Sequence, residues 1–162
     1  MSQDLTLPSG SDGMVNIRVG AIIRRGDKLL MMKDKRDGAY YTIGGRVQFG
    51  ETAEEAIRRE VEEELGFQLQ PTSLAFIHEN FFYGDYEKLG YNKLVYEICW
   101  YFLMETPENL EALLSSSRGE ESENLSWISL DTSSLYYPQF FREELKKSFS
   151  GVKHLVSADA RA

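Results

Sequence analysis

The chain has 162 residues, of which 42% are hydrophobic and 27% charged, enough apolar side chains for the core of one globular domain. Its formal net charge of −8 argues against duplex nucleic acid as a partner, because contacts with the phosphate backbone normally need a basic face. The first residues are polar and no apolar run approaches the length of a membrane-spanning helix, so we expect no signal peptide, no membrane partner and a cytoplasmic location. The single Cys99 excludes an internal disulfide and is expected in the core.

Three segments are predicted along the chain. Residues 1–13 are rich in Ser, Gly and Asp and are expected to be disordered. Residues 14–150 are expected to form the folded domain, and residues 151–162 a C-terminal tail.

The folded domain is predicted to begin with a β-hairpin. Val15 to Arg24 alternates in hydrophobicity as a strand does, Arg25-Gly26-Asp27 is typical of a tight turn, and Lys28 to Lys33 is predicted to pair back as a second strand. A short strand is then predicted from Tyr40 to Gly44.

A helix is predicted from about Ala53 to Leu65. Thr52 and Glu55 have the spacing of a capping box, and Gly66 is typical of a left-handed C-terminal stop. The helical period places the apolar residues on one stripe that should face a core: Ile57, Val61 and Leu65.

The remaining elements are predicted mostly as strands. In chain order they are Phe67 to Phe82 with a break at Pro71-Thr72-Ser73, a polar loop from Tyr83 to Asn92, a strand from Lys93 to Met104, a short helix from Pro107 to Leu114, a strand from Leu125 to Leu130, and a second long helix that starts at Pro138 and carries Phe140, Phe141, Leu145 and Phe149 on one face. Strands mixed with two helices in this order favour an α/β fold with a mixed β-sheet between helices.

Three carboxylates of the first predicted helix need an explanation. Glu60, Glu63 and Glu64 stand at i, i+3 and i+4, so they converge on one patch at the edge of the buried stripe. An acidic helix is most often a solvated surface, but partly buried carboxylates one turn apart repel each other and lose hydration. They therefore call for a metal ion or a basic partner, and Arg59 can reach toward Glu51 or Glu63.

The loop before this helix favours a hard cation. Gly44-Gly45 and Gly50 allow close approach of the backbone to a ligand. Because the segment offers backbone carbonyls and carboxylates without His or Cys, it suits Mg²⁺ or Mn²⁺ better than Zn²⁺.

The stretch from Gly45 to Phe67 reads Gly45-x5-Glu51-x7-Arg59-Glu60-Val61-x-Glu63-Glu64-x-Gly66-Phe67. It resembles the Nudix box, the loop-helix-loop signature of the Nudix hydrolases. The order of the other segments is also similar to that family, from about Asn16 to Phe149. The resemblance implies an α/β/α sandwich with a mixed β-sheet between helices.

The resemblance implies a role for each polar position of the box. It assigns the divalent cation to Glu60, Glu64 and the carbonyl group of Gly44, metal binding or general-base catalysis to Glu63, and orientation of the box to the pair of Arg59 and Glu51.

Two positions need separate mention. Many members of the family have proline where Ile43 precedes Gly44-Gly45, and we expect this departure to be tolerated. The family often supplies another acidic metal ligand from a distant loop, and Glu121, before Trp127, is the candidate here. A mobile acidic loop at residues 118–124 is the alternative.

The implied reaction is the hydrolysis of a nucleoside diphosphate linked to another moiety, by attack of water on phosphorus in the presence of Mg²⁺ or Mn²⁺. ADP-ribose or a related nucleotide sugar is the first expectation for this small-molecule partner, followed by nucleoside triphosphates and dinucleoside polyphosphates. The alternative is a non-catalytic Nudix-like module that binds nucleotide derivatives or regulates, which the intact box disfavours. A homodimer is possible because many members of the family pair.

Four residues outside the carboxylate set are candidates for substrate binding. Arg46 and Lys33 are expected to hold a phosphate, and Tyr41 and Phe82 to stack on a nucleobase. Solvated basic side chains and ordinary aromatic packing are the alternatives. His78 is expected to be a structural histidine.

Overall fold

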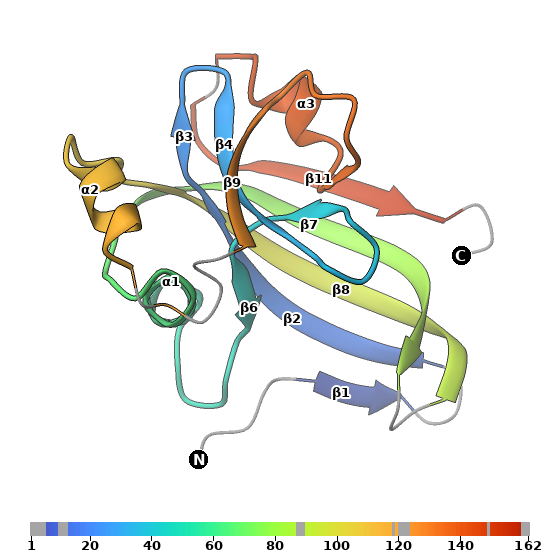
Figure 1. Cartoon of the computed structure of the whole chain (residues 1–162). Coiled ribbons are helices and arrows are strands. Elements are labelled where there is room, and N and C mark those ends of the chain that lie inside the picture. The colour runs from blue at the N-terminus through green and yellow to red at the C-terminus, as the bar shows by residue number, and fades with distance from the viewer. Residues whose placement is uncertain are drawn as a thin grey trace.

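The computed structural model describes residues 6–9, 13–86, 90–117, 119, 124–148 and 150–159 (Figure 1). Its strands are β1 (Thr6–Ser9), β2 (Gly13–Ile22), β3 (Arg24–Arg25), β4 (Lys28–Lys33), β5 (Tyr40–Tyr41), β6 (Gly44–Arg46), β7 (Pro71–Tyr86), β8 (Gly90–Met104), β9 (Leu125–Ser129), β10 (Tyr136–Tyr137) and β11 (Lys153–Ala158). Its helices are α1 (Ala53–Leu65), α2 (Leu110–Ser115) and α3 (Phe141–Glu144).

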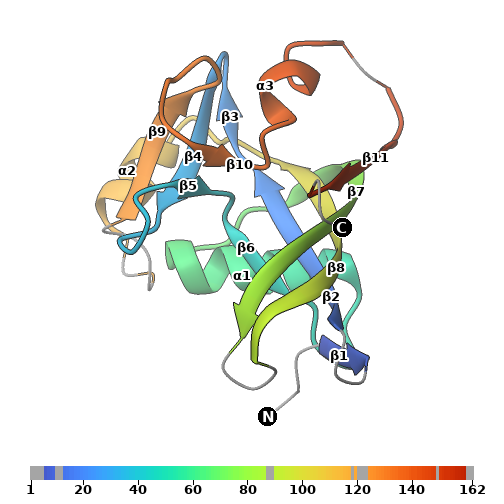
Figure 2. The same cartoon turned by 90° about the vertical axis from the view of Figure 1, so that its right-hand side faces the viewer.

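A mixed six-stranded sheet forms the centre of the molecule. Its order is β1-β2-β8-β7-β11, and β6 also pairs with β2. The long strands β7 and β8 are antiparallel, whereas β8 runs parallel to β2 and β11 runs parallel to β7. A second sheet has the order β10-β5-β4-β3, with β9 paired to β4, and stands above one end of the first (Figure 2).

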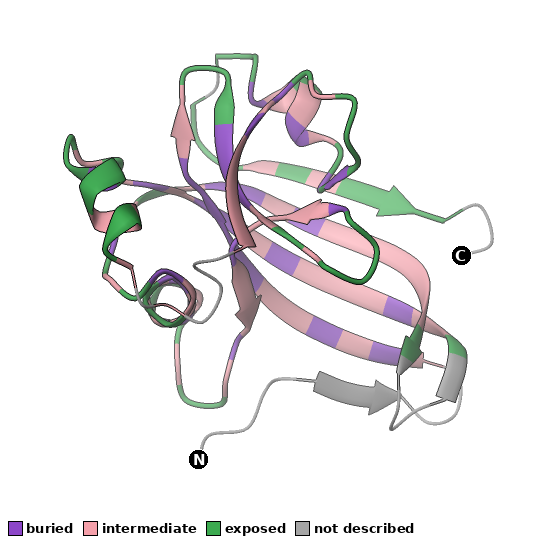
Figure 3. Ribbon diagram, viewed as in Figure 1, coloured by how far each residue is buried: buried purple, intermediate pink, exposed green. Residues whose placement is uncertain are grey.

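Two hydrophobic cores lie on opposite faces of the large sheet. Because side chains alternate along a strand, Val19 and Ala21 of β2 face α1, whereas Ile22 belongs to the other core. The first core contains the apolar stripe of α1, and the second contains Phe141 and Leu145 from the region of α3. Figure 3 shows the alternation of buried and half-buried residues along β2 and β8. The predicted α/β fold, with a mixed sheet between helices, is confirmed.

The helix α1 has the bounds that its end residues predicted. The Thr52 Oγ1 atom accepts a hydrogen bond from the backbone N–H of Glu55 at 3.2 Å, and the Glu55 carboxylate accepts one from the N–H of Thr52 at 2.8 Å. Gly66 ends the helix at φ 76°, where a side chain would be strained. Its predicted stripe is buried together with Ala56.

Both chain ends contain more structure than the sequence predicted. Thr6–Ser9, predicted as disordered, pairs antiparallel with β2, and the predicted tail contains β11, which adds six residues to the edge of β7. Neither segment has a strong periodic pattern of apolar residues. Each is a short edge strand whose position depends on the neighbouring strand with which it pairs.

Several predicted elements differ. The strand predicted from Tyr40 to Gly44 is divided into β5 and β6, and the loop predicted from Tyr83 to Asn92 contains the end of β7 and the start of β8. The second long helix is only the single turn α3, in which Phe141 and Leu145 keep their predicted spacing and burial, and Phe149 lies outside the described residues. The break expected at Pro71 is instead the start of β7, where the missing N–H of proline is tolerated, and register shifts follow within the next residues. No helix in the described part of the chain has the length and apolar character to span a membrane.

Candidate active site

The loop from β6 into α1 brings a carboxyl group onto a glycine. A Cβ atom added at Gly45 would overlap all three atoms of the Glu60 carboxyl group. The preceding Gly44 has φ 149° and lies against the backbone of Val19 and Gly20. The Gly-Gly pair is therefore required by the close approach of this glutamate and of β2.

Arg59 ties the loop and the helix together. Its guanidinium donates two hydrogen bonds to Glu51, at 2.7 and 3.0 Å, and one to the backbone carbonyl of Arg46 at 3.0 Å. Its Nη1 atom donates to Glu60 at 2.7 Å and lies 3.3 Å from Glu63. The two-pronged contact with Glu51 fixes the planar guanidinium, so Arg59 holds the acidic face of α1 in one orientation.

The acids on this face have different environments. The side chain of Glu60 is only 13% exposed, and burial raises its pKa although Arg59 opposes the shift. Glu63 adds to that rise by like-charge repulsion, and its own side chain is 50% exposed. One carboxyl oxygen of Glu64 is buried. The site therefore holds one desolvated carboxyl group next to one that faces water.

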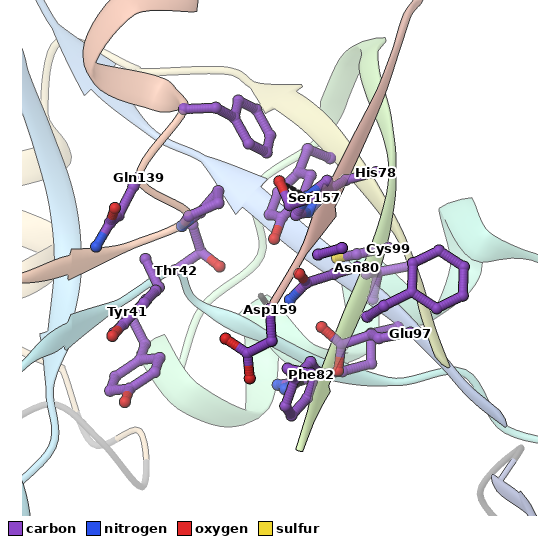
Figure 4. Close-up of a pocket in the computed structure, with 18 residues that line it drawn as sticks. Tyr41, Thr42, His78, Asn80, Phe82, Glu97, Cys99, Gln139, Ser157 and Asp159 are labelled. Carbon is purple, nitrogen blue, oxygen red and sulfur yellow. Dashed lines mark hydrogen bonds and ion pairs between the residues drawn. The ribbon is translucent and has the colours of Figure 1, made fainter. Parts of the chain in front are cut away.

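A cavity of about 600 Å³ is lined by Cys99 and Tyr101 of the second core, so it lies on the face of the large sheet opposite α1. Figure 4 shows the side chains that line it. Aromatic side chains form part of its wall, and the ring of Tyr41 stacks on that of Tyr137 with centroids 5.4 Å apart. Its other lining side chains are mainly polar: Arg18, Thr42, His78, Asn80, Glu97, Gln139, Ser157 and Asp159.

Arg18 connects the cavity to the box. It lines the cavity, and its Nη1 atom lies 3.8 Å from the Glu97 carboxylate. Burial by itself lowers the pKa of Arg18, but the pKa is raised overall, and the charge of Glu97 is the largest cause of that rise. The guanidinium thus remains charged beside Glu97. Asn16 completes the network by donating to Glu97 at 2.9 Å and accepting from Arg46 at 3.0 Å.

The sequence model of the NUDIX domain matches residues 14–148. The chain belongs to the Nudix family. The segment Gly45–Phe67 is therefore its Nudix box, and members of this family generally use divalent cations.

Named relatives match over shorter stretches. An NAD-capped RNA hydrolase, NudC, from Pasteurella multocida is 46% identical over 50 residues, which are 30% of this chain and 19% of that protein. An ADP-ribose pyrophosphatase from Methanocaldococcus jannaschii is 36% identical over 67 residues, 40% of each chain. The matched segments thus span less than half of these relatives.

Solved structures support the fold. An ADP-ribose pyrophosphatase from Streptococcus suis aligns with a TM-score of 0.55 and 15% identity over 86% of this chain and 98% of that one. A MutT protein from Bacillus halodurans aligns with a TM-score of 0.57 and 17% identity over 86% and 89% of the two chains. At these identities the likeness concerns the fold alone.

The Nudix box fits a hard divalent cation by its chemistry. It offers only oxygen donors, Gly45 leaves room for the Glu60 carboxyl group, and a nearby cation would offset the desolvation of that group. Among the residues that the structure describes, no three His, Cys, Asp or Glu side chains form a metal-binding group. Glu121, the fourth predicted carboxylate, lies outside the described residues, so the predicted ligand set stays a prediction.

The predicted substrate residues divide into two pairs. Tyr41 and Phe82 line the cavity. Lys33 and Arg46 do not: the Lys33 ammonium lies 5.7 Å from the centre of the Tyr40 ring, and Arg46 donates to Asn16. Each of the two basic side chains contacts a residue of a neighbouring strand.

The sequence reasoning missed several cavity residues. Arg18 and Glu97 had a usable signal, because each is a charged residue inside a strand that otherwise has apolar neighbours. Ser157 and Asp159 had none, because they lie in a segment taken as a tail. His78 is buried and donates to or accepts from Ser157 at 2.9 Å, and burial lowers its pKa to about 4, so the ring is neutral at physiological pH. This fits the predicted structural role.

Proposed function

We propose that this Nudix hydrolase is a divalent-cation-dependent pyrophosphohydrolase that cleaves a nucleoside diphosphate linked to another moiety. ADP-ribose or a related nucleotide sugar is the first candidate substrate, ahead of nucleoside triphosphates and dinucleoside polyphosphates. A homodimer and a cytoplasmic location stay predictions.

The observation that carries this proposal is the joint position of the cavity and the box. A volume of about 600 Å³ suits a nucleoside or sugar moiety, and aromatic rings at its wall suit a base or sugar face. Arg18 lines the cavity and lies opposite Arg46 of the box in the pairing of β2 with β6. A substrate with its large moiety in the cavity would have to extend past Arg18 and the edge strand β6 for its diphosphate to reach the acidic face of α1.

The candidate cation ligands are Glu60, Glu64, Glu63 and the carbonyl group of Gly44, together with Glu121 beyond the described residues. A bound Mg²⁺ or Mn²⁺ would neutralise the diphosphate and lower the pKa of coordinated water. Arg59 holds Glu60 in place through the hydrogen bond at 2.7 Å, and Glu51 in turn holds Arg59.

Glu63 is our candidate for the general base. Its side chain is 50% exposed, against 13% for Glu60 and 16% for Glu51. A carboxylate in contact with water can take a proton from a water molecule that attacks phosphorus. The guanidinium of Arg59, 3.3 Å from Glu63, orients this carboxylate.

Arg18 is our candidate for holding the diphosphate. Its guanidinium is paired only loosely with Glu97, at 3.8 Å, so it has donors for phosphate oxygens. The similarity of part of the chain to an ADP-ribose pyrophosphatase agrees with a substrate of this class.

The test is product release from a panel of ADP-ribose, another nucleotide sugar, a nucleoside triphosphate and a dinucleoside polyphosphate, each with Mg²⁺, with Mn²⁺ and with EDTA. We expect nucleoside monophosphate from a nucleotide sugar with a cation and none with EDTA. Binding of ADP-ribose without turnover under either cation would favour the regulatory or binding module instead.

A further inference from the structure

The cavity is closed on one side by β11, a strand beyond the part of the chain that the family model matches. The match ends at residue 148, and β11 spans Lys153–Ala158. In Figure 4 this strand passes over the cavity, and Asp159 follows its last residue. Ser157, Ala158 and Asp159 all line the cavity.

The strand is held firmly in this position. It pairs with β7 along its whole length, from Lys153 opposite Phe76 to Ala158 opposite Phe81. His154 makes a 2.6 Å contact with Glu79, and the Lys153 ammonium donates to Glu144 of α3 at 2.9 Å.

Asp159 is positioned by its own backbone and by its carboxylate. Its N–H donates to the carbonyl of Phe81 at 2.8 Å, and its Oδ2 atom accepts from the N–H of Tyr83 at 3.3 Å. One carboxyl oxygen of Asp159 is therefore used in the hydrogen bond to β7, while the carboxyl group lies at the cavity wall.

A second carboxylate in the cavity, Glu97, already accepts from Asn16 at 2.9 Å and lies 3.8 Å from Arg18, so Asp159 defines the chemistry of the wall at β11. Ionised carboxylates only accept hydrogen bonds, and they repel a phosphate. The moiety that lies against Asp159 must therefore carry hydroxyl or amino donors and no negative charge of its own.

We propose that β11 is part of the substrate site and that Asp159 is a specificity-determining residue, which accepts hydrogen bonds from hydroxyl or amino groups of the substrate moiety held in the cavity. This inference rests on the proposed function, because it assumes that the diphosphate lies at the Nudix box. Asp159 then contributes to binding and not to the chemical step, since it contacts a part of the substrate remote from the reacting phosphorus.

The test is Asp159→Asn in the full chain. Asparagine keeps the shape and can still accept from the Tyr83 N–H, so the melting temperature should not change. Loss of a charge-assisted hydrogen bond should raise KM for ADP-ribose, or for the best substrate of the panel, about tenfold with kcat unchanged. Asp131→Asn is the matched control, because Asp131 is 65% exposed, pairs with Lys146 and does not line the cavity.

Direct binding measurements distinguish whether the hydrogen-bond donors to Asp159 come from the nucleoside or from the second sugar of the substrate. Binding of AMP and of ribose 5-phosphate is measured by calorimetry. If the nucleoside lies in the cavity, Asp159→Asn should bind AMP more weakly than the wild type does. If the second sugar lies there, the variant should bind ribose 5-phosphate more weakly. Unchanged affinity for both, together with an unchanged KM, would overturn the inference. A wild-type protein that turns over no substrate of the panel would overturn the proposed function, while the binding comparison would still decide the role of Asp159.

Discussion

Replacing Gly45 with alanine should separate the activity of this enzyme from its stability. The new Cβ would overlap the carboxyl group of Glu60, which is the end of a flexible side chain and not backbone. The glutamate can therefore rotate away without displacing α1. The protein should still fold, but the carboxyl group of Glu60, a candidate cation ligand, would be displaced.

The two effects have different magnitudes. A displacement on the order of 1 Å at a catalytic group costs about 10²-fold in rate, or about 2.7 kcal/mol at 1.36 kcal/mol per tenfold. The weakened contact between Glu60 and Arg59 should cost about 1 kcal/mol of folding free energy. The cost is small because Arg59 keeps its hydrogen bonds with Glu51. Alanine also restricts the unfolded chain, which returns about 0.4–1 kcal/mol. We thus expect a large fall in kcat with nearly unchanged stability.

Gly26→Ala is the control for this experiment. Gly26 has φ 59° and no atom within 4 Å of an added Cβ, so alanine there is strained by its backbone alone. It should lose about 1 kcal/mol of stability and keep full activity. The assays are steady-state kinetics with Mg²⁺ and urea unfolding of both variants. Full activity of Gly45→Ala would refute the placement of Glu60 in the site.

Three further variants test other parts of the site. Glu64→Gln removes charge from the predicted cation shell but keeps the shape, so turnover should fall by orders of magnitude with normal melting; equal activity would remove Glu64 from the site. Arg59→Ala leaves Glu51 and the desolvated Glu60 without their shared guanidinium, so stability should fall by about 1–3 kcal/mol and rate should fall as well; normal melting and normal kinetics would contradict the pairing. His78 has its pKa lowered to about 4, against 6.5 when unfolded, so the unfolded chain binds more protons between these values and stability should drop as pH falls through this window, by up to about 3 kcal/mol. Unfolding of His78→Gln at several pH values should show a shallower loss, and an equal slope in both proteins would argue against a neutral buried ring.

The box helix could be predicted from sequence because its determinants are local. Thr52, Glu55 and Gly66 define its ends through contacts within a few residues, and the period of its apolar residues defines its buried face. The contact of Arg59 with Glu51 also follows from spacing along the loop and the first turns of one helix.

The cavity could not be predicted in the same way, because its wall depends on strand pairing. Arg18 and Glu97 meet only because β2 and β8 are parallel neighbours, although they are far apart in sequence. Asp159 reaches the cavity only because β11 adds to the edge of β7. A short edge strand without a periodic pattern gives little signal before its partner strand is known.

The central claim is that a divalent cation held at the Nudix box allows water to attack phosphorus of a nucleoside diphosphate derivative. The most direct measurement is hydrolysis of ADP-ribose in ¹⁸O-labelled water, with Mg²⁺ or Mn²⁺ and with EDTA, followed by mass spectrometry of AMP and ribose 5-phosphate. The account predicts label in a phosphate group of one product, and no product with EDTA. Product formed equally in EDTA, or label incorporated away from phosphorus, would contradict it.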